Sequence, residues 1–178
     1  IETFDVTCYD YNDGSISGEM SGGTGELTLA GSPALNENIS GVGSVSILLN
    51  NVQPADYLLV VTDENDCLDS SSVIITQPSA SVQSTIVKTT HILCKGDCNG
   101  LAIVEPTGGV ENYTFDWFDA PGSVTDSTIN DLCPGTYNVR TADGNGCSDT
   151  VAVEITEPDE LSGFINATMV NCKSKCDG

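Results

Sequence analysis

Cysteine is the residue type in this 178-residue chain whose number and spacing point to chemistry. The chain has eight cysteines but one histidine, His91, and it contains no pair of close Cys-x-x-Cys motifs. Structural zinc sites usually need such clustered thiol and imidazole ligands, whereas scattered cysteines in an oxidising compartment form disulfides. We therefore interpret the cysteines as disulfide partners.

The cysteines belong to an internal repeat. Six residues recur 80 positions later, namely Tyr57, Asp63, Asn65, Cys67, Thr76 and Pro78 as Tyr137, Asp143, Asn145, Cys147, Thr156 and Pro158. Nearer the start the shift is 86 positions, for Cys8, Gly14, Gly22 and Gly23 against Cys94, Gly100, Gly108 and Gly109. The first copy therefore carries six additional residues between Leu27 and Tyr57. This predicts modules at residues 1–79 and 80–159, and the opening strand of a third, truncated module at residues 160–178.

A module of this size has a marginal core and is expected to need a cross-link. The first copy holds only Cys8 and Cys67, so an internal bridge would join them, and its counterpart would join Cys94 to Cys147. Closing a loop of roughly fifty to sixty residues stabilises a domain by about 4 kcal/mol in the chain-entropy treatment. These bridges are predicted to stabilise each module from within.

The second copy has two further cysteines, Cys98 and Cys133, where the first has Asn12 and Gln53. Because both are missing together from the first copy, we predict that they bond to each other. Cys172 and Cys176 would then have partners beyond the end of this sequence. An alternative uses local bridges across three residues and one remaining pair: Cys94 to Cys98, Cys172 to Cys176, and Cys133 to Cys147.

The remaining sequence indicates strands and turns. Residues 137–141 and 151–155 alternate between apolar and polar side chains, as half-buried strands do, and the first copy repeats the pattern at the same phases. The segment between them, residues 143–146, reads Asp-Gly-Asn-Gly and suits a tight hairpin with positive φ angles. Further strands are expected at residues 85–93, 101–105 and 113–118. About seven short strands per module predict an all-β chain of tandem immunoglobulin-like β-sandwich repeats with intra-module disulfides.

Four segments of the second module form a combined pattern: residues 108–117, 132–137, 143–147 and 155–158. They resemble the SprB-type repeat of Bacteroidota gliding-motility adhesins, with its GG-x-x-x-Y-x-Y-x-W core, L-x-x-G-x-Y turn, D-x-x-G-C hairpin and closing I-T-x-P. The resemblance implies a long filament on the outer surface of a bacterial cell, exported by the type IX secretion system. Its partners would be neighbouring repeats of the same chain and extracellular surfaces or polysaccharide.

The first module departs from this pattern. Leu27 and Gly31 stand where the aromatic residue and the tryptophan would be, and Ala55 replaces the glycine before Tyr57. Its core must therefore be packed differently, and the additional residues are expected to help.

Acidic residues are spread over the whole array. The chain has 26 Asp and Glu against five Lys and Arg, and the first module has no basic residue. Such a surface repels nucleic acid and anionic membranes, so we expect neither as a partner, and no membrane insertion. Like-charged modules should resist collapse onto one another, and the same acidity keeps an exposed protein soluble.

Neither metal binding nor catalysis has a clear signature. Residues 63–66, Asp-Glu-Asn-Asp, could offer oxygens to calcium, but the equivalent turn at residues 143–146 has a single carboxylate. A hairpin turn explains the segment better, so we assign no cofactor and no metal ligand, with calcium as the alternative. His91 lies in an expected strand beside Ile92 and Leu93, and no G-x-S-x-G motif is present. We therefore expect no catalytic residue and no enzymatic activity.

Two short segments match the Asp-Ser/Thr motif at which Bacteroidota O-glycosylate exported proteins. If the resemblance holds, Ser127 and Thr150 would carry sugars.

Two functions remain from this reading. In the first, the modules are spacers in an adhesin filament, and adhesion arises from many weak contacts or from another part of the protein. In the second, a module is a carbohydrate-binding lectin that stacks sugars on Tyr113, Trp117 and Phe118. Strand alternation places Tyr113, Phe115 and Trp117 on one face, which favours a core and leaves Phe118 exposed.

Overall fold

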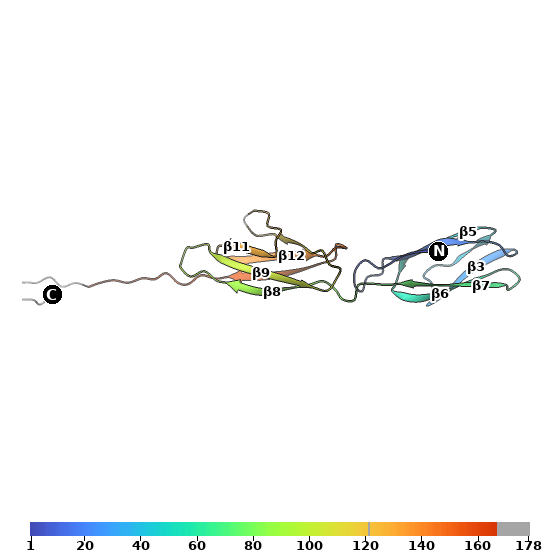
Figure 1. Ribbon diagram of the computed structural model, residues 1–178, viewed down its shortest axis with the longest axis horizontal. Coiled ribbons are helices and arrows are strands. Elements are labelled where there is room, and N and C mark those ends of the chain that lie inside the picture. The colour runs from blue at the N-terminus through green and yellow to red at the C-terminus, as the bar shows by residue number, and fades with distance from the viewer. Residues whose placement is uncertain (121, 167–178) are drawn as a thin grey trace, which may run out of the picture.

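The fold is described from a computed structural model, which covers residues 1–120 and 122–166. Its strands fall into two groups that lie end to end along one long axis, joined by a short linker at residues 76–82 (Figure 1). Most of the proposed third module, residues 167–178 with Cys172 and Cys176, lies outside the described residues. Residues 156–166 contain no strand.

The first group contains seven strands: β1 (Glu2–Phe4), β2 (Gly14–Met20), β3 (Glu26–Ser32), β4 (Ile39–Val42), β5 (Val45–Val52), β6 (Ala55–Thr62) and β7 (Leu68–Ile75). They form two antiparallel sheets with the orders β1-β2-β5 and β4-β3-β6-β7. The chain crosses between the sheets three times, from β2 to β3, from β4 to β5 and from β5 to β6, which gives the interleaved connections of an immunoglobulin-like sandwich.

The second group repeats this plan with six strands: β8 (Gln83–Thr90), β9 (Gly100–Thr107), β10 (Thr114–Trp117), β11 (Thr128–Leu132), β12 (Gly135–Ala142) and β13 (Ser148–Ile155). The sheet orders are β11-β9-β8 and β10-β12-β13. Only the counterpart of β4 is absent from its described residues. The expected all-β immunoglobulin-like fold is thus confirmed, and the strands expected at residues 85–93, 101–105 and 113–118 correspond to β8, β9 and β10.

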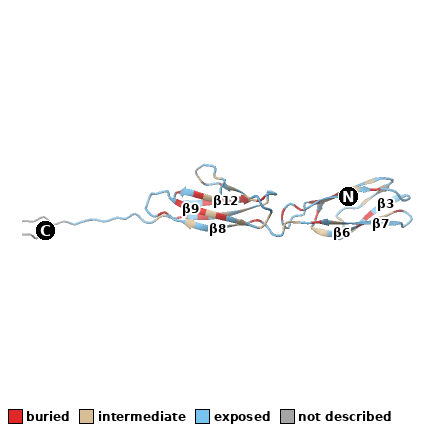
Figure 2. Cartoon of the chain, in the orientation of Figure 1, coloured by how far each residue is buried: buried red, intermediate tan, exposed pale blue. Residues whose placement is uncertain are grey.

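Each group of strands encloses its own core (Figure 2). The first core includes Ile16, Leu49 and Ile75, and the second includes Val104, Leu132 and Val139, each at most 2% exposed. The period-two pattern explains this arrangement, because alternate residues of each strand point between the two sheets.

The first core has no tryptophan, and other residues fill the place that Trp117 takes in the second core. Trp117 pairs with Val139 across β10 and β12, and Gly31 pairs with Leu59 at the equivalent place across β3 and β6. A Cβ atom on Gly31 would lie 2.6 Å from the Leu35 side chain, so Leu35 covers this glycine. Leu35 lies between Leu27 and Tyr57, where the additional residues fall, and it packs against the core. The expected help from this region is therefore present.

Both modules contain a tyrosine corner. The Tyr57 hydroxyl donates a hydrogen bond to the Gln53 carbonyl (3.1 Å), and the Tyr137 hydroxyl donates one to the Cys133 carbonyl (3.0 Å). Both tyrosines are buried near the start of a strand, at the corner where the chain crosses between sheets. Immunoglobulin-like sandwiches use this contact to close the corner.

We predict that Tyr137→Phe lowers the free energy of unfolding by about 1 kcal/mol, because the Cys133 carbonyl loses its partner. Urea denaturation followed by circular dichroism measures the change. Tyr11→Phe is the matched control, since Tyr11 is 58% exposed. Equal stability of the two variants would contradict a structural role for the corner.

Candidate functional site: the joint between the modules

The hairpin between β12 and β13 faces the first module and is built around one carboxylate. Asp143 is 5% exposed, and its Oδ1 accepts hydrogen bonds from the backbone N–H groups of Asn145 and Cys147, both at 2.9 Å. Its Oδ2 accepts the N–H of Val110, also at 2.9 Å. Gly146 closes the turn with a φ of 86°. The expected tight hairpin is confirmed, and its carboxylate fixes the position of Cys147.

The loop between β1 and β2 presents Cys8 from the first module. Its backbone is tied to the segment after β7, because the Val6 N–H donates to the Thr76 carbonyl (2.9 Å) and the Asp10 N–H donates to Gln77 Oε1 (2.8 Å). The Tyr11 N–H closes a turn onto the Cys8 carbonyl (3.1 Å). Cys8 itself is 9% exposed. The loop therefore holds the cysteine at the end of the module from which the linker leaves.

A disulfide joins the two modules. Cys8 is bonded to Cys147, 139 residues away in sequence, with a Cα–Cα distance of 5.7 Å. Beside it, the Asn145 side-chain amide donates a hydrogen bond to the Thr7 carbonyl (2.9 Å). Thr7 is held in turn by Asp13, whose Oδ1 accepts the Thr7 N–H at 3.0 Å. The Thr7 hydroxyl also donates to this carboxylate, and this bond, together with that of the Thr7 N–H, holds the pKa of Asp13 below its ordinary value.

This disulfide corrects two predicted pairings, Cys8 with Cys67 and Cys94 with Cys147. The physical reason is the length of a strand. Cys8 lies where β7 ends and Cys67 where β7 begins, and eight extended residues separate the two positions by about 26 Å. A disulfide requires Cα atoms within about 7 Å, so the two cannot meet inside one folded module. The same holds for Cys94 and Cys147 at the two ends of β13.

Cys98 is bonded to Cys133, which confirms the pairing predicted by comparing the two copies. It ties the loop between β8 and β9 to the corner between β11 and β12. The alternative of local bridges does not occur among the described cysteines, because Cys94 is unbonded there and Cys147 is bonded to Cys8. Cys67 and Cys94 are both exposed thiols.

The linker is packed against the second module. The Gly109 N–H donates to the Ala80 carbonyl (2.9 Å), and Val82 is 7% exposed. Gly109 has a φ of 65°, and a Cβ atom there would lie 2.5 Å from Val82. The glycine is therefore needed for the close approach of linker and turn. Sequence comparison found Gly108 and Gly109 as repeated positions but not this contact.

The equivalent hairpin of the first module explains the acidic segment at residues 63–66. Asp63 is 8% exposed, and its carboxylate accepts the backbone N–H groups of Cys67, Asn65 and Thr24. These bonds, led by that of Cys67, lower the pKa of Asp63 to about 2. One oxygen is thus used inside the turn and the other by the loop between β2 and β3. Among the residues that the structure describes, no cluster of three or more His, Cys, Asp or Glu side chains could hold a metal ion.

The aromatic residues considered for sugar stacking have different surroundings. Trp117 is 2% exposed, and its indole N–H donates to the Asp126 carbonyl (3.0 Å). Tyr113 is half-buried and donates its hydroxyl proton to the Gly108 carbonyl (2.5 Å). Phe118 is 53% exposed, as alternation predicts. The three rings therefore do not form one exposed platform.

The other singled-out residues lie apart from the joint. Thr150 is exposed on β13, and Ser127 is half-buried before β11. The ring of His91 accepts the Thr156 N–H through Nδ1 (3.2 Å), at the place where Asp5 accepts the Thr76 N–H in the first module (2.7 Å). A structural role thus accounts for this histidine. Within the described ranges, no helix is long and apolar enough to cross a bilayer.

No family model matches the chain, and no curated protein does. Among solved structures, the chain is similar to the crystal structure of DIP-gamma IG1+IG2, at 10% identity over 82% of this chain and 90% of that chain, with a TM-score of 0.39. It is also similar to Dpr11 IG1 bound to DIP-gamma IG+IG2, at 10% identity over 80% of this chain and 90% of that chain, with a TM-score of 0.32.

The low pKa of Asp63 predicts an acid-sensitive hairpin. Because the pKa is lower in the folded state than its ordinary value of 3.8, the carboxylate stabilises the fold above about pH 4. That contribution is lost as the pH falls from about 4 to 2. In Asp63→Asn it is missing at every pH, so the thermal midpoint should lie below that of the unsubstituted chain at pH 6 and approach it at pH 2.5.

Circular dichroism melting curves at several pH values measure this convergence. Asp56→Asn is the control, because Asp56 is an exposed residue of β6. A difference in midpoint that stays constant between pH 6 and pH 2.5 would contradict the prediction for Asp63.

Proposed function

We propose that this chain is a non-catalytic repeat segment of a large extracellular adhesin filament and that its modules act as an extended, disulfide-stabilised stalk. The filament belongs to a bacterial cell surface, is of the gliding-motility type and is exported by type IX secretion, as the resemblance to SprB-type repeats implies. Its adhesive contacts are made with extracellular surfaces or polysaccharide. Ser127 and Thr150 are its proposed glycosylation sites.

The observation that carries this proposal is the disulfide between Cys8 and Cys147. A hinge between two domains normally allows relative motion, because interdomain contacts are small and polar. Here a covalent bond, the Asn145 to Thr7 hydrogen bond and the packed linker all act at one joint. Two modules held end to end at three points form a stiff rod, which a stalk requires and a mobile catalytic or recognition domain does not.

Disulfides and charge are consistent with this setting. Two disulfides in one short chain are typical of proteins outside the cytosol. The formal net charge of −21 keeps neighbouring filaments apart at distances near the Debye length of about 8 Å.

The joint predicts how the chain responds to force applied at its two termini. With the bond intact, the residues between Cys8 and Cys147 cannot be drawn out, because tension passes directly through the sulfur atoms. Reduction should therefore add up to about 480 Å of extension, from 139 residues at roughly 3.5 Å each. Single-molecule pulling with and without reductant measures the difference.

The paired substitution Cys8→Ser with Cys147→Ser should add up to about 360 Å without reductant, because the intact Cys98–Cys133 bond still bypasses 35 of the released residues. Cys98→Ser with Cys133→Ser is the matched control, because that disulfide lies within the bypassed segment and its loss should leave the extension short. A long extension of the unsubstituted, oxidised chain would contradict the stalk proposal.

The alternative function is a carbohydrate-binding lectin module. The burial of Trp117 and the separate exposure of Phe118 favour the stalk, because a sugar platform needs accessible rings.

We predict that polysaccharide leaves the fluorescence of Trp117, the single tryptophan, unchanged. Titration with bacterial and algal polysaccharides tests this, and the urea-unfolded chain serves as the control for the emission of an exposed ring. A saturable change in emission from the folded chain would support the lectin and oppose the stalk.

A further inference from the structure

Two exposed thiols, Cys67 and Cys94, are not explained by the joint described above. Cys67 corresponds in the repeat to Cys147, and Cys94 corresponds to Cys8, so the unbonded cysteines are the counterparts of the bonded pair. Cys67 therefore lies in a hairpin like the one that carries Cys147 at the joint, and Cys94 lies in a loop like the one that carries Cys8. The hairpin belongs to the first module and the loop to the second.

The hairpin that holds Cys67 is built like the hairpin that holds Cys147. In both, the first aspartate accepts the cysteine N–H at 2.9 Å and donates its own N–H to the cysteine carbonyl, for Asp63 with Cys67 and Asp143 with Cys147. Asn65 and Asn145 donate their N–H groups to the same carboxylates, also at 2.9 Å. Asn65 thus occupies the place from which Asn145 reaches across the joint.

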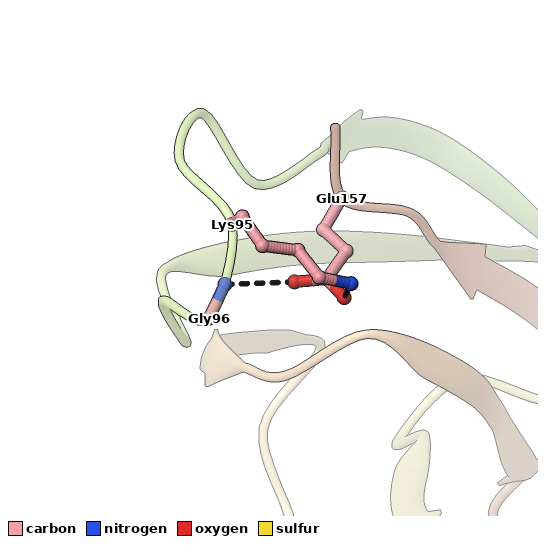
Figure 3. Close-up of polar contacts among 3 residues, drawn as sticks. All are labelled: Lys95, Gly96 and Glu157. Atoms are coloured by element: carbon pink, nitrogen blue, oxygen red, sulfur yellow. Dashed lines mark hydrogen bonds and ion pairs between the residues drawn. The ribbon is translucent and has the colours of Figure 1, made fainter. Parts of the chain in front are cut away.

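The loop that holds Cys94 is likewise built like the loop that holds Cys8. The Ile92 N–H donates to the Thr156 carbonyl, as Val6 donates to Thr76, and the Asp97 N–H closes a turn onto the Cys94 carbonyl, as Tyr11 does onto Cys8. Glu157 accepts the Gly96 N–H (2.8 Å) and pairs with Lys95 (Figure 3). Gln77, at its place in the first module, accepts the Asp10 N–H (2.8 Å).

The two halves also face outward at opposite ends. The β6–β7 hairpin lies at the outer end of the first group of strands, and the β8–β9 loop lies at the outer end of the second (Figure 1). Beside the thiols, Leu68 is 69% exposed and Leu93 is 79% exposed. Leu93 stands at the place of Thr7, whose carbonyl accepts the hydrogen bond across the joint.

We propose that Cys67 and Cys94 are each bonded to a further module of the same kind, so that every joint of the array carries a disulfide. Cys67 takes the opening-loop cysteine of the preceding module, and Cys94 takes the hairpin cysteine of the following one. This rests on the proposed function, because it supplies the flanking modules of the stalk. The Asn65 side-chain amide donates one N–H to the Thr24 hydroxyl, and in the bonded joint its other N–H donates to the preceding module as Asn145 does to Thr7.

The bond forms by thiol–disulfide exchange with a small-molecule disulfide. One thiolate attacks that disulfide and forms a mixed disulfide, and the second thiolate then displaces the remaining small thiol. Two protein thiols are oxidised, one small-molecule disulfide is reduced, and two small thiols leave with the two protons.

A fully bonded array would resist lengthening even if its modules unfolded. Between Cys67 and Cys94 the chain runs through β7, the linker and β8, two extended strands that follow one another along the long axis (Figure 1). These 27 residues can reach at most about 97 Å, and two strands of eight residues already lie extended within them. Each terminal disulfide would pass tension to another such segment.

A tandem chain tests the proposal. Residues 1–164 are followed directly by residues 1–178, which places the second copy's Cys8 where Cys172 stands in the sequence, and Cys172 and Cys176 of the second copy are changed to serine. After oxidation in a buffer of reduced and oxidised glutathione, in which the reduced thiol removes mixed disulfides from unpaired cysteines, Cys94 of the first copy should be bonded to Cys67 of the second. Maleimide labelling should then fall from four thiols per chain, two from each copy, to two.

Peptide mapping without reduction identifies the bond, and the Cys8–Cys147 peptides of the same sample show that the joint has formed. The tandem with Cys94→Ser in its first copy is the control and should label at three thiols. Labelling at four thiols with both Cys8–Cys147 bonds present would overturn the proposal while leaving the stalk function standing. Absence of the Cys8–Cys147 bonds would overturn both the joint and its extension.

A second measurement uses the single chain with Cys172→Ser and Cys176→Ser. On oxidation it should form a ladder in steps of 18.5 kDa, linked mainly through Cys67 to Cys94. Random collision would instead give like pairs, Cys67 to Cys67 and Cys94 to Cys94, in about half of the bonds. That even mixture would also overturn the proposal.

Discussion

The length of a β-strand decides which cysteines of this chain can meet. An eight-residue strand separates the two ends of a module by about 26 Å, and one cysteine lies at each end. Such cysteines cannot form a disulfide with each other inside one module, but each can form a disulfide with a neighbouring module. The end-to-end arrangement, the stiffness of the joint and the proposed path of tension all follow from this separation.

The joint depends on aspartate carboxylates whose oxygens accept hydrogen bonds from backbone N–H groups. Asp63 and Asp143 each gather several N–H groups of their hairpin, which satisfies donors that would otherwise be lost in a tight turn. A carboxylate stabilised in this way is a poor ligand for a cation, because its lone pairs are already occupied. The acidic hairpins thus act as rigid supports for a cysteine.

Local pattern was sufficient to predict much of the fold. Period-two alternation identified β6, β7, β12 and β13, the repeat offsets identified two copies, and the absence of two cysteines from the first copy identified the Cys98–Cys133 pair. The other pairings were predicted wrongly because the comparison of copies treats each module as closed. Offsets show that Cys8 and Cys94 are equivalent, but not which end of a sandwich they occupy. A signal was present in the hairpin motif, since a cysteine beside a tight turn must lie at a module end.

The tyrosine corner and Leu35 show two different limits of sequence reading. Tyr57 and Tyr137 were found as repeated residues, but the carbonyl that each one binds becomes apparent only when the chain crosses between sheets. Leu35 has no counterpart at the same offset in the second module, so no comparison of copies could assign it to the gap above Gly31.

The two modules have similar hydrogen bonds around the cysteines at their ends, but their cores are packed differently. Trp117 fills one core, whereas Gly31 and Leu35 fill the equivalent space in the other. In contrast, the backbone hydrogen bonds of Val6 and Tyr11 near Cys8 recur for Ile92 and Asp97 near Cys94, and the aspartate-centred bonds around Cys67 recur around Cys147. A core is repacked by changes within one module, because its neighbours do not touch it. A joint takes its loop from one module and its hairpin from the next, so any change in one half must fit every module that meets it.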